Sequence, residues 1–169
     1  MLLPYKDITP TIGKDVWIAD NASVIGDTVI GDESNIWFGV TIRGDVHEIR
    51  IGKRTNIQDH TLIHTTRNVS GSYIGDEVTI GHGAIIHACT IEDQVLVGMG
   101  AIILDEAVME KNSMLAAGSV LPPKKRVPSG QLWGGTPAKY MRDLAQEELD
   151  FLPVSADNYV KLAQDYKVG

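Results

Sequence analysis

An aliphatic residue recurs at every sixth position through most of this chain. The register holds at eighteen positions in four runs: Ile12, Ile18, Val24, Ile30, Ile36, Ile42; Ile51, Ile57, Ile63; Ile74, Ile80, Ile86; and Ile91, Val97, Ile103, Met109, Leu115, Leu121. A helix repeats its apolar face about every 3.6 residues and a simple strand about every 2, so a sustained period of six excludes a helical bundle. The pattern predicts a β-solenoid, whose stacked coils bury rings of aliphatic side chains together.

This period resembles that of the hexapeptide-repeat family, whose members are left-handed triangular β-helices with three hexapeptides in each coil. By that rule the eighteen positions give about six coils. The left-handed sense comes from the resemblance alone. Small or β-branched residues usually stand four positions after an inward one, as at Val40, Thr61 and Ala84, and such side chains fit tight corners.

The sequence predicts a single domain in three parts. The repeat occupies about residues 11–122, residues 123–137 form an exit loop rich in Pro and Gly, and residues 138–169 form a helical segment. We expect one helix to begin after Pro137 and to end at Pro153, and a second to begin at Ser155 as N-cap. The predicted fold is therefore an all-β solenoid with C-terminal α-helices packed alongside.

Three interruptions of the register mark where the chain leaves the column. Three residues are inserted between Ile42 and Ile51, five are inserted between Ile63 and Ile74, and one is missing just after His87. All three interruptions flank the stretch 64–87, which holds three of the five histidines. A functional solenoid is expected to depart from its own rule where it carries its site.

Stacking of the coils places two histidines over one another. His64 and His87 each follow an inward residue of one column, so they should lie one coil apart, about 5 Å, with Arg43 in the coil below. Two imidazoles at that separation can bind one ion. His82 falls on a neighbouring side of the triangle, but a cyclic trimer sets one side of a subunit against a different side of the next. We therefore predict a metal site shared between subunits of a homotrimer.

Other polar residues accompany these histidines. Arg43, Asp45 and Asp59 have two readings that we leave open, an ion network between subunits or a direct part in catalysis. His47 and His60 have no such partners in the pattern, so we expect them to be surface or loop residues.

At this point the sequence resembles the γ-class carbonic anhydrases along essentially the whole chain. The matching segments are RGD, NIQDH, LIH and GHGAIIH, which hold Arg43, Asp45, Asn56, Gln58, Asp59, His64, His82 and His87. The resemblance implies Zn²⁺, with Fe²⁺ or Co²⁺ as alternatives, held by His64, His87 and a neighbour's His82. It also implies reversible hydration of CO₂ to bicarbonate by a metal-bound hydroxide at the trimer interfaces.

The same resemblance implies roles for individual residues. Gln58 would hydrogen-bond the hydroxide, Asn56 would orient CO₂ or bicarbonate, and Tyr159 would reach the site from the C-terminal helix. The residues expected to fix the interface that forms the pocket are Arg43, Asp45 and Asp59.

The sequence departs from the family beside the site. The family's best-studied type carries glutamates there, but Val46 follows Asp45 and residues 65–73 contain no carboxylate. We therefore expect proton export to be slow, with His47 or Glu48 as the available substitutes.

Composition limits the partners. The 22 acidic and 15 basic residues give a net charge of −7, which offers no basic face to a nucleic acid. Cys89 is the only cysteine, which excludes an intrachain disulfide and favours a buried thiol in a reducing compartment. Pro4, Asp7 and Pro10 interrupt any signal peptide, and no apolar run approaches the roughly 20 residues of a membrane span. We expect a soluble cytoplasmic protein without a membrane or nucleic-acid partner.

Two other functions fit the fold. One is a metal-assisted acyl-CoA thioesterase or acyltransferase-related enzyme, although a transferase needs only one catalytic histidine and leaves three aligned ones unexplained. The other is a non-catalytic trimeric scaffold in which the ion only locks the assembly.

Overall fold

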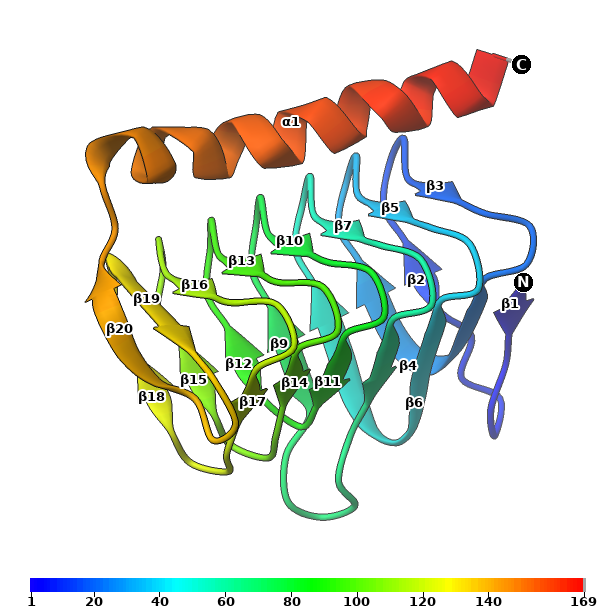
Figure 1. Ribbon diagram of the computed structural model, residues 1–169. Coiled ribbons are helices and arrows are strands. Elements are labelled where there is room, and N and C mark those ends of the chain that lie inside the picture. The colour runs from blue at the N-terminus through cyan, green and yellow to red at the C-terminus, as the bar shows by residue number, and fades with distance from the viewer. Residues whose placement is uncertain (169) are drawn as a thin grey trace.

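The computed structural model describes residues 1–168 and confirms the β-solenoid (Figure 1). It is a parallel solenoid of about seven turns followed by one helix, an arrangement consistent with the left-handed β-helix that the resemblance implies. The sequence predicted about six coils, and the additional turn lies at the C-terminal end of the column.

We call the side of the solenoid that carries His64 and His87 the histidine face. Its strands are paired in parallel along the column. In order they are β1 (Leu2–Leu3), the first part of β4 (Ser23–Ile30), the first part of β6 (Thr41–Ile51), β8 (Leu62–His64), β11 (Ile85–His87), β14 (Ile102–Ile103) and β17 (Val120–Leu121).

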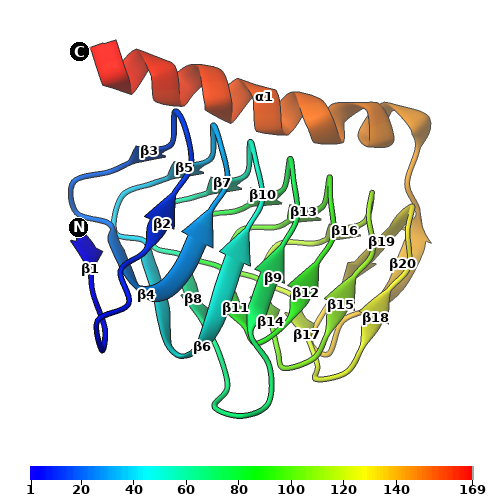
Figure 2. The ribbon, with the colours of Figure 1, turned by 180° about the vertical axis from the view of Figure 1, so that it is seen from behind.

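Strands β4 and β6 are long enough to turn a corner and continue into the second face, seen from behind in Figure 2. The other strands of this face are β2 (Thr11–Ile12), β9 (Ser72–Ile74), β12 (Thr90–Ile91), β15 (Val108–Met109) and β18 (Arg126–Val127). Gly26 pairs with Gly44 and Thr28 pairs with Ile49, which leaves residues 45–48 opposite Asp27 alone. The insertion predicted after Ile42 is therefore a bulge in a continuous strand.

The third side is covered by the helix α1 (Gln146–Val168), and we call it the helix face (Figure 1). Its strands are β3 (Trp17–Ile18), β5 (Asn35–Ile36), β7 (Asn56–Ile57), β10 (Thr79–Ile80), β13 (Leu96–Val97), β16 (Met114–Leu115), β19 (Gln131–Gly134) and β20 (Lys139–Asp143). All are parallel except β20, which pairs antiparallel with β19 at the end of the column.

The core is the aliphatic column that the period predicts. Of the eighteen predicted inward residues, all but Ile12 and Ile18 in the first coil are at most 4% exposed. Full burial of each such side chain contributes about 1.5–3 kcal/mol. Between coils, main-chain groups pair directly, for example from Gln58 N to Ile80 O at 3.0 Å. Apolar burial and interstrand hydrogen bonds together hold the stack.

The repeat continues beyond the predicted end at Leu121. Val127 is fully buried and pairs with Met109, and Trp133 pairs with Leu115. These residues stand six and twelve positions after Leu121, so they follow the same period. Residues 123–137, predicted as an exit loop, therefore contain β18 and β19, and their Pro and Gly residues belong to the corners of a further coil.

The C-terminal segment also differs from the prediction. Residues 139–143 form β20, and a single helix begins at Gln146 and runs through Pro153 and Ser155 to Val168. A proline inside a helix costs about 3 kcal/mol because it removes a hydrogen bond and crowds the preceding turn. Leu152 and Ala156 on either side of Pro153 are buried, and their packing offsets that cost. Within residues 1–168, no helix is long and apolar enough to cross a membrane.

Candidate metal centre

The structure places His64 and His87 as the stacking predicts. β8 and β11 pair with His64 opposite His87, and the two ring centroids lie 5.3 Å apart. Nδ1 of His64 lies 3.3 Å from Nε2 of His87. The expected separation of one coil is therefore confirmed, although the two residues are 23 positions apart in sequence.

A carboxylate holds the outer nitrogen of each ring. Nε2 of His64 lies 3.0 Å from Oδ1 of Asp45, and Nδ1 of His87 lies 2.7 Å from Oδ1 of Asp105. Asp45, His64, His87 and Asp105 come from four successive coils. They form a linear chain with two imidazoles in the middle and a carboxylate at each end.

Both carboxyl groups have a pKa below the usual value of an aspartate. Burial acts to raise the pKa of Asp45, but hydrogen bonds with His64 and Arg43 outweigh it. At Asp105 burial again acts to raise the pKa, and hydrogen bonds with Thr66 and His87 outweigh it. Both groups are therefore ionised at neutral pH, and an ionised carboxylate only accepts hydrogen bonds.

The geometry of the two histidines in this Asp45–His64–His87–Asp105 row fits two ligands of a zinc ion. Because each carboxylate only accepts, the ring nitrogen that faces it carries the proton. In neutral rings, Nδ1 of His64 and Nε2 of His87 then carry the lone pairs, and these two nitrogens lie 3.3 Å apart. Two nitrogens at 2.0–2.1 Å from a tetrahedral ion are separated by about 3.3–3.4 Å. A carboxylate on the other nitrogen is also the usual arrangement of a metal-binding histidine.

His82 lies in the turn that leads from β10 on the helix face to β11 on the histidine face. Its Nδ1 is 2.8 Å from Oδ2 of Asp59, and its side chain is 47% exposed. Over residues 1–168, no three His, Cys, Asp or Glu side chains come together closely enough to hold a metal ion. The pair of histidines and His82 are thus separate within one chain.

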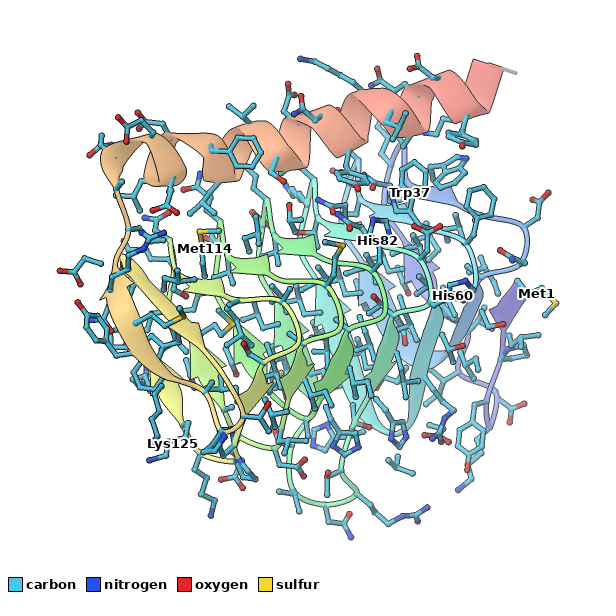
Figure 3. The ribbon with its side chains drawn as sticks, in the orientation of Figure 1. Met1, Trp37, His60, His82, Met114 and Lys125 are labelled. Carbon is cyan, nitrogen blue, oxygen red and sulfur yellow. The ribbon has the colours of Figure 1, made fainter. Side chains whose placement is uncertain are left out.

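A pocket of about 460 Å³ opens on the helix face beside His82. Gln58 and Tyr159, two residues predicted for the site, line it together with His82. Figure 3 shows His82 and Met114, another lining residue, along the side of the solenoid beneath α1. Most of its wall is apolar, with side chains that include Leu96, Met99, Met114 and Leu132.

Gln58 is oriented by a hydrogen-bonded chain that crosses the helix face. Its Nε2 donates to Oδ1 of Asn56 at 3.0 Å, and Nδ2 of Asn56 donates to Oγ1 of Thr79 at 2.9 Å. The Thr79 hydroxyl lies 2.9 Å from that of Ser155 on α1. Asn56 is fully buried and does not line the pocket, so within this chain it supports Gln58.

Tyr159 packs its ring edge against Trp37, with centroids 5.5 Å apart and an interplanar angle of 83°. Burial, and then the charge of Asp59, raise the pKa of its hydroxyl, which stays protonated at neutral pH. Figure 3 shows Trp37 beneath α1. The expectation that α1 brings a tyrosine near the predicted residues agrees with its place in the pocket beside Gln58 and His82.

The predicted residues thus form two groups that one chain does not bring together. The group on the histidine face is Arg43, Asp45, His64 and His87. The group around the pocket is Asn56, Gln58, Asp59, His82 and Tyr159. His60 follows Asp59 at an exposed corner with φ of 60°, as a loop residue.

Sequence reasoning missed four residues of these networks: Thr66, Thr79, Asp105 and Ser155. Thr79 pairs directly with Asn56, so the column rule predicts that contact when it is applied to the position before each inward residue. Asp105 stands two positions after the inward Ile103, one position beyond those we compared. Ser155, predicted as an N-cap, lies inside α1 and faces Thr79.

Comparison with known proteins supports both the hexapeptide-repeat fold and the resemblance to γ-class carbonic anhydrases. Residues 9–44 match a family described as bacterial transferase hexapeptide (six repeats). Gamma carbonic anhydrase 2, mitochondrial, of Arabidopsis thaliana is 53% identical over 168 residues, which are 96% of this chain and 60% of that protein. A carbonic anhydrase of Geobacillus kaustophilus is 41% identical, over 99% of this chain and 91% of that protein.

A solved structure of a putative acetyltransferase from Bacillus cereus is 39% identical, with a TM-score of 0.96 over 99% of this chain and 97% of that one. The chain spans about 60% of the length of the Arabidopsis relative. These identities extend along nearly the whole chain, as the sequence resemblance does. The chain belongs to the γ-class carbonic anhydrase-like family of hexapeptide-repeat proteins.

Proposed function

We propose that this protein is a metal-dependent enzyme that interconverts CO₂ and bicarbonate at the interfaces of a homotrimer. The observation that carries the proposal is the facing pair His64 and His87, each ring fixed by a carboxylate. The names of the Arabidopsis and Geobacillus relatives point to the same reaction. The cytoplasmic location stays a prediction, and the Arabidopsis relative is named as mitochondrial.

The metal would be Zn²⁺, with Fe²⁺ or Co²⁺ as alternatives, held by His64, His87 and His82 of the partner subunit. Three neutral imidazoles with an open position are typical of catalytic rather than structural zinc. When bound, the ion supplies a Lewis acid that makes water acidic enough to give a nucleophile near neutral pH, as zinc does in carbonic anhydrases of other folds.

Residues of this chain would orient the reactants. One N–H of Gln58 is taken by Asn56, so its Oε1 and second N–H remain for hydrogen bonds in the pocket. Oε1 can accept the proton of the attacking oxygen and direct its lone pair at the carbon of CO₂. The apolar wall, with Leu96 and Met99, suits an uncharged substrate and keeps bulk water away.

The two candidates for proton export, Glu48 and His47, differ in their hydrogen bonds. Glu48 accepts from the Tyr73 hydroxyl at 3.0 Å and from Nη2 of Arg50 at 2.6 Å, so its carboxylate is already occupied. His47 accepts a hydrogen bond from the backbone N–H of Glu48 through Nδ1 at 2.9 Å, so its neutral ring carries the proton on Nε2. It can release that proton to solvent once Nδ1 has taken up another proton in place of this bond. Both residues line a pocket of about 210 Å³ together with Asp45. We assign proton export to His47.

Mixed trimers test the shared site directly. In the proposed trimer, a site is complete only where one subunit donates both His64 and His87 and the next donates His82. Random assembly of equal amounts of His87→Ala and His82→Ala subunits should therefore restore about a quarter of the sites. Each variant alone should bind no zinc at this site and hydrate no CO₂. A mixture that regains neither zinc nor activity would contradict a site built from two chains.

Activity is measured by stopped-flow CO₂ hydration on zinc-loaded protein. We expect hydration above the buffer rate in the natural protein and at the buffer rate in His87→Ala. His60→Ala is the matched control, because His60 is exposed and its side chain takes part in none of the hydrogen bonds that link the residues of the two groups. A natural protein that hydrates CO₂ no faster than buffer would remove the carbonic anhydrase assignment.

The pocket favours one second candidate, a metal-assisted acyl-CoA thioesterase. A volume of about 460 Å³ far exceeds what CO₂ needs, and its apolar wall could hold an acyl chain. The structural relative from Bacillus cereus, described as a putative acetyltransferase, is consistent with acyl chemistry on this fold. A panel of acyl-CoA substrates of increasing chain length distinguishes the two enzymes. The thioesterase is favoured if the protein hydrolyses acyl-CoA, loses this activity in His87→Ala, and does not hydrate CO₂.

A further inference from the structure

We propose that Asp105 and Thr66 act as a positioning pair that fixes the ring of His87 for the metal centre. This inference rests on the function proposed above, which needs Nε2 of His87 to be free. Asp105 follows β14, one coil beyond β11 and His87. Neither residue belongs to the groups that the sequence predicted.

Both oxygens of the Asp105 carboxylate have a partner. Oδ1 lies 2.7 Å from Nδ1 of His87, and Oδ2 accepts a hydrogen bond from the Thr66 hydroxyl. A carboxylate held at both oxygens cannot rotate without losing one bond. It therefore sets the tilt of the imidazole as well as the ring nitrogen that carries the proton.

In a neutral ring whose proton is on Nδ1, Nε2 of His87 carries the lone pair, and it faces Nδ1 of His64 at 3.3 Å. If the ring rotated or took the other tautomer, the N–H would point at the ion and prevent binding. At the other end of this row of four side chains, Asp45 contacts His64 in the same way. Asp45 also pairs with Arg43, whereas the partners of Asp105 within residues 1–168 are the imidazole of His87 and the hydroxyl of Thr66, and no Lys or Arg pairs with it there. The charge of Asp105 is therefore the less compensated of the two.

Thr66 supplies the second constraint from a distant part of the chain. It lies in the loop 65–71, which projects from the solenoid between β8 and β9 (Figures 1 and 2). A short bridge closes this loop, with Thr66 N donating to Ser70 O at 3.2 Å. The residues at the tip, 67–69, are exposed. The loop thus carries a hydroxyl to Asp105, 39 positions later, and couples its own position to His87.

Two isosteric changes remove these bonds without opening the core. Asp105→Asn keeps the shape but lets an amide N–H face the ring, so either tautomer of His87 becomes acceptable. Thr66→Val keeps the shape and removes the hydroxyl. Glu106→Gln is the matched control, because it removes one negative charge from the next residue, whose partner is Lys124 and not His87.

The first measurement uses metal-free protein and ¹⁵N-labelled histidine. Ring nitrogen shifts should show one tautomer of His87, with the proton on Nδ1, in the natural protein and in Glu106→Gln. Asp105→Asn should give a mixture, and Thr66→Val a partial one. An unchanged tautomer in Asp105→Asn would overturn the positioning role, whatever the metal does.

The second measurement is zinc affinity by competition with a chelator. Loss of an outer-shell partner weakens metal binding by about 10–100-fold, which we expect for Asp105→Asn, with a smaller loss for Thr66→Val. The visible spectrum of cobalt-loaded protein should shift in the same order. Equal losses in Asp105→Asn and Glu106→Gln would show a mere charge effect and refute positioning. If the natural protein binds no zinc, the proposed function fails, while the tautomer result still decides whether Asp105 orients His87.

Discussion

Oδ2 of Asp59 lies 2.8 Å from Nδ1 of His82 across one coil of the solenoid. Of the three proposed ligands, His82 is the one in the turn between the helix face and the histidine face, and Asp59 leaves its Nε2 for a metal. We predict that Asp59→Asn weakens zinc binding by about 10–100-fold. Competition with a chelator measures it, and Asp20→Asn, at an exposed position, is the control. Equal affinity in the two variants would show that Asp59 does not support the ligand.

Gln58 should act on turnover more than on substrate binding. Gln58 is 5% exposed and its amide is held by Asn56, so it is preorganised for a group that forms during reaction. Removing one such preorganised polar group costs about 10²-fold in kcat, which we expect for Gln58→Ala with KM little changed. Gln94→Ala, at a distant corner where Gln94 bonds to Glu77, should leave both constants unaltered. A rise in KM alone would assign Gln58 to binding.

Cys89 should be inert in the folded protein. Burial raises the pKa of its thiol to about 12, and the side chain is fully buried. Because the thiolate is the reactive form, a thiol reagent at pH 8 should label Cys89 only after denaturation. Cys89→Ser should lower the free energy of unfolding by about 1–3 kcal/mol, because it buries a hydroxyl. Rapid labelling of native protein would disprove this burial.

Glu148, near the start of α1, should make the stability of the fold depend on pH. The hydrogen bonds from Arg142, and then that from the backbone N–H of Ala145, lower the pKa of Glu148 to about 2. Because the folded pKa lies below the unfolded value of 4.5, the group stabilises the fold above about pH 4.5. That contribution is lost as the pH falls from 4.5 toward 2.

Carboxyl carbon shifts over this pH range give the midpoint for Glu148. Glu148→Gln should remove that part of the acid dependence of unfolding. The variant also loses the ion pair with Arg142, so the comparison is made between the shapes of the two pH curves. A midpoint near 4.5 in the folded protein would contradict the predicted link.

The aliphatic column should be sensitive to truncation. Met109 is fully buried, whereas Met141 on β20 is 59% exposed. Met109→Ala should lower the free energy of unfolding by about 2–5 kcal/mol, since it leaves a cavity between coils. Met141→Ala should change it by less than about 0.5 kcal/mol. Denaturant unfolding of both variants measures the difference, and similar costs would argue against a single close-packed column.

Much of the fold could be predicted because each coil of a solenoid uses a fixed number of residues, which sets the residues that lie over one another. His64 and His87 fall opposite one another because 23 residues equal one coil of eighteen plus an insertion of five. The same counting extends to Val127 and Trp133, but the Pro, Lys and Gly residues within 122–130 suggested a loop. A solenoid turns a corner several times in each coil, so turn-forming residues by themselves do not signal its end.

The contacts of individual side chains were harder to predict. Asp105 reaches His87 through the direction of its side chain, which the period does not specify. Pro153 suggested the end of a helix, because local propensity cannot reveal that Leu152 and Ala156 are buried against the solenoid. Whether His82 of one chain meets the histidine pair of another depends on the assembly.

The helix α1 runs the length of the column and returns to its beginning (Figure 1). Near its end, Tyr166 packs on Trp17 with ring centroids 5.2 Å apart, and Nζ of Lys167 donates to the backbone oxygen of Asp15 at 2.6 Å. Coils that contact only their neighbours can fray one at a time from either tip. Here unfolding of the first coil must also break its contacts with the C-terminal end of α1, a helix that begins after the last coil. The first and last coils therefore open together, with one free energy. Backbone amides in the first and last coils should therefore show similar protection from hydrogen exchange. Protection should not fall gradually from the middle coils toward the two ends.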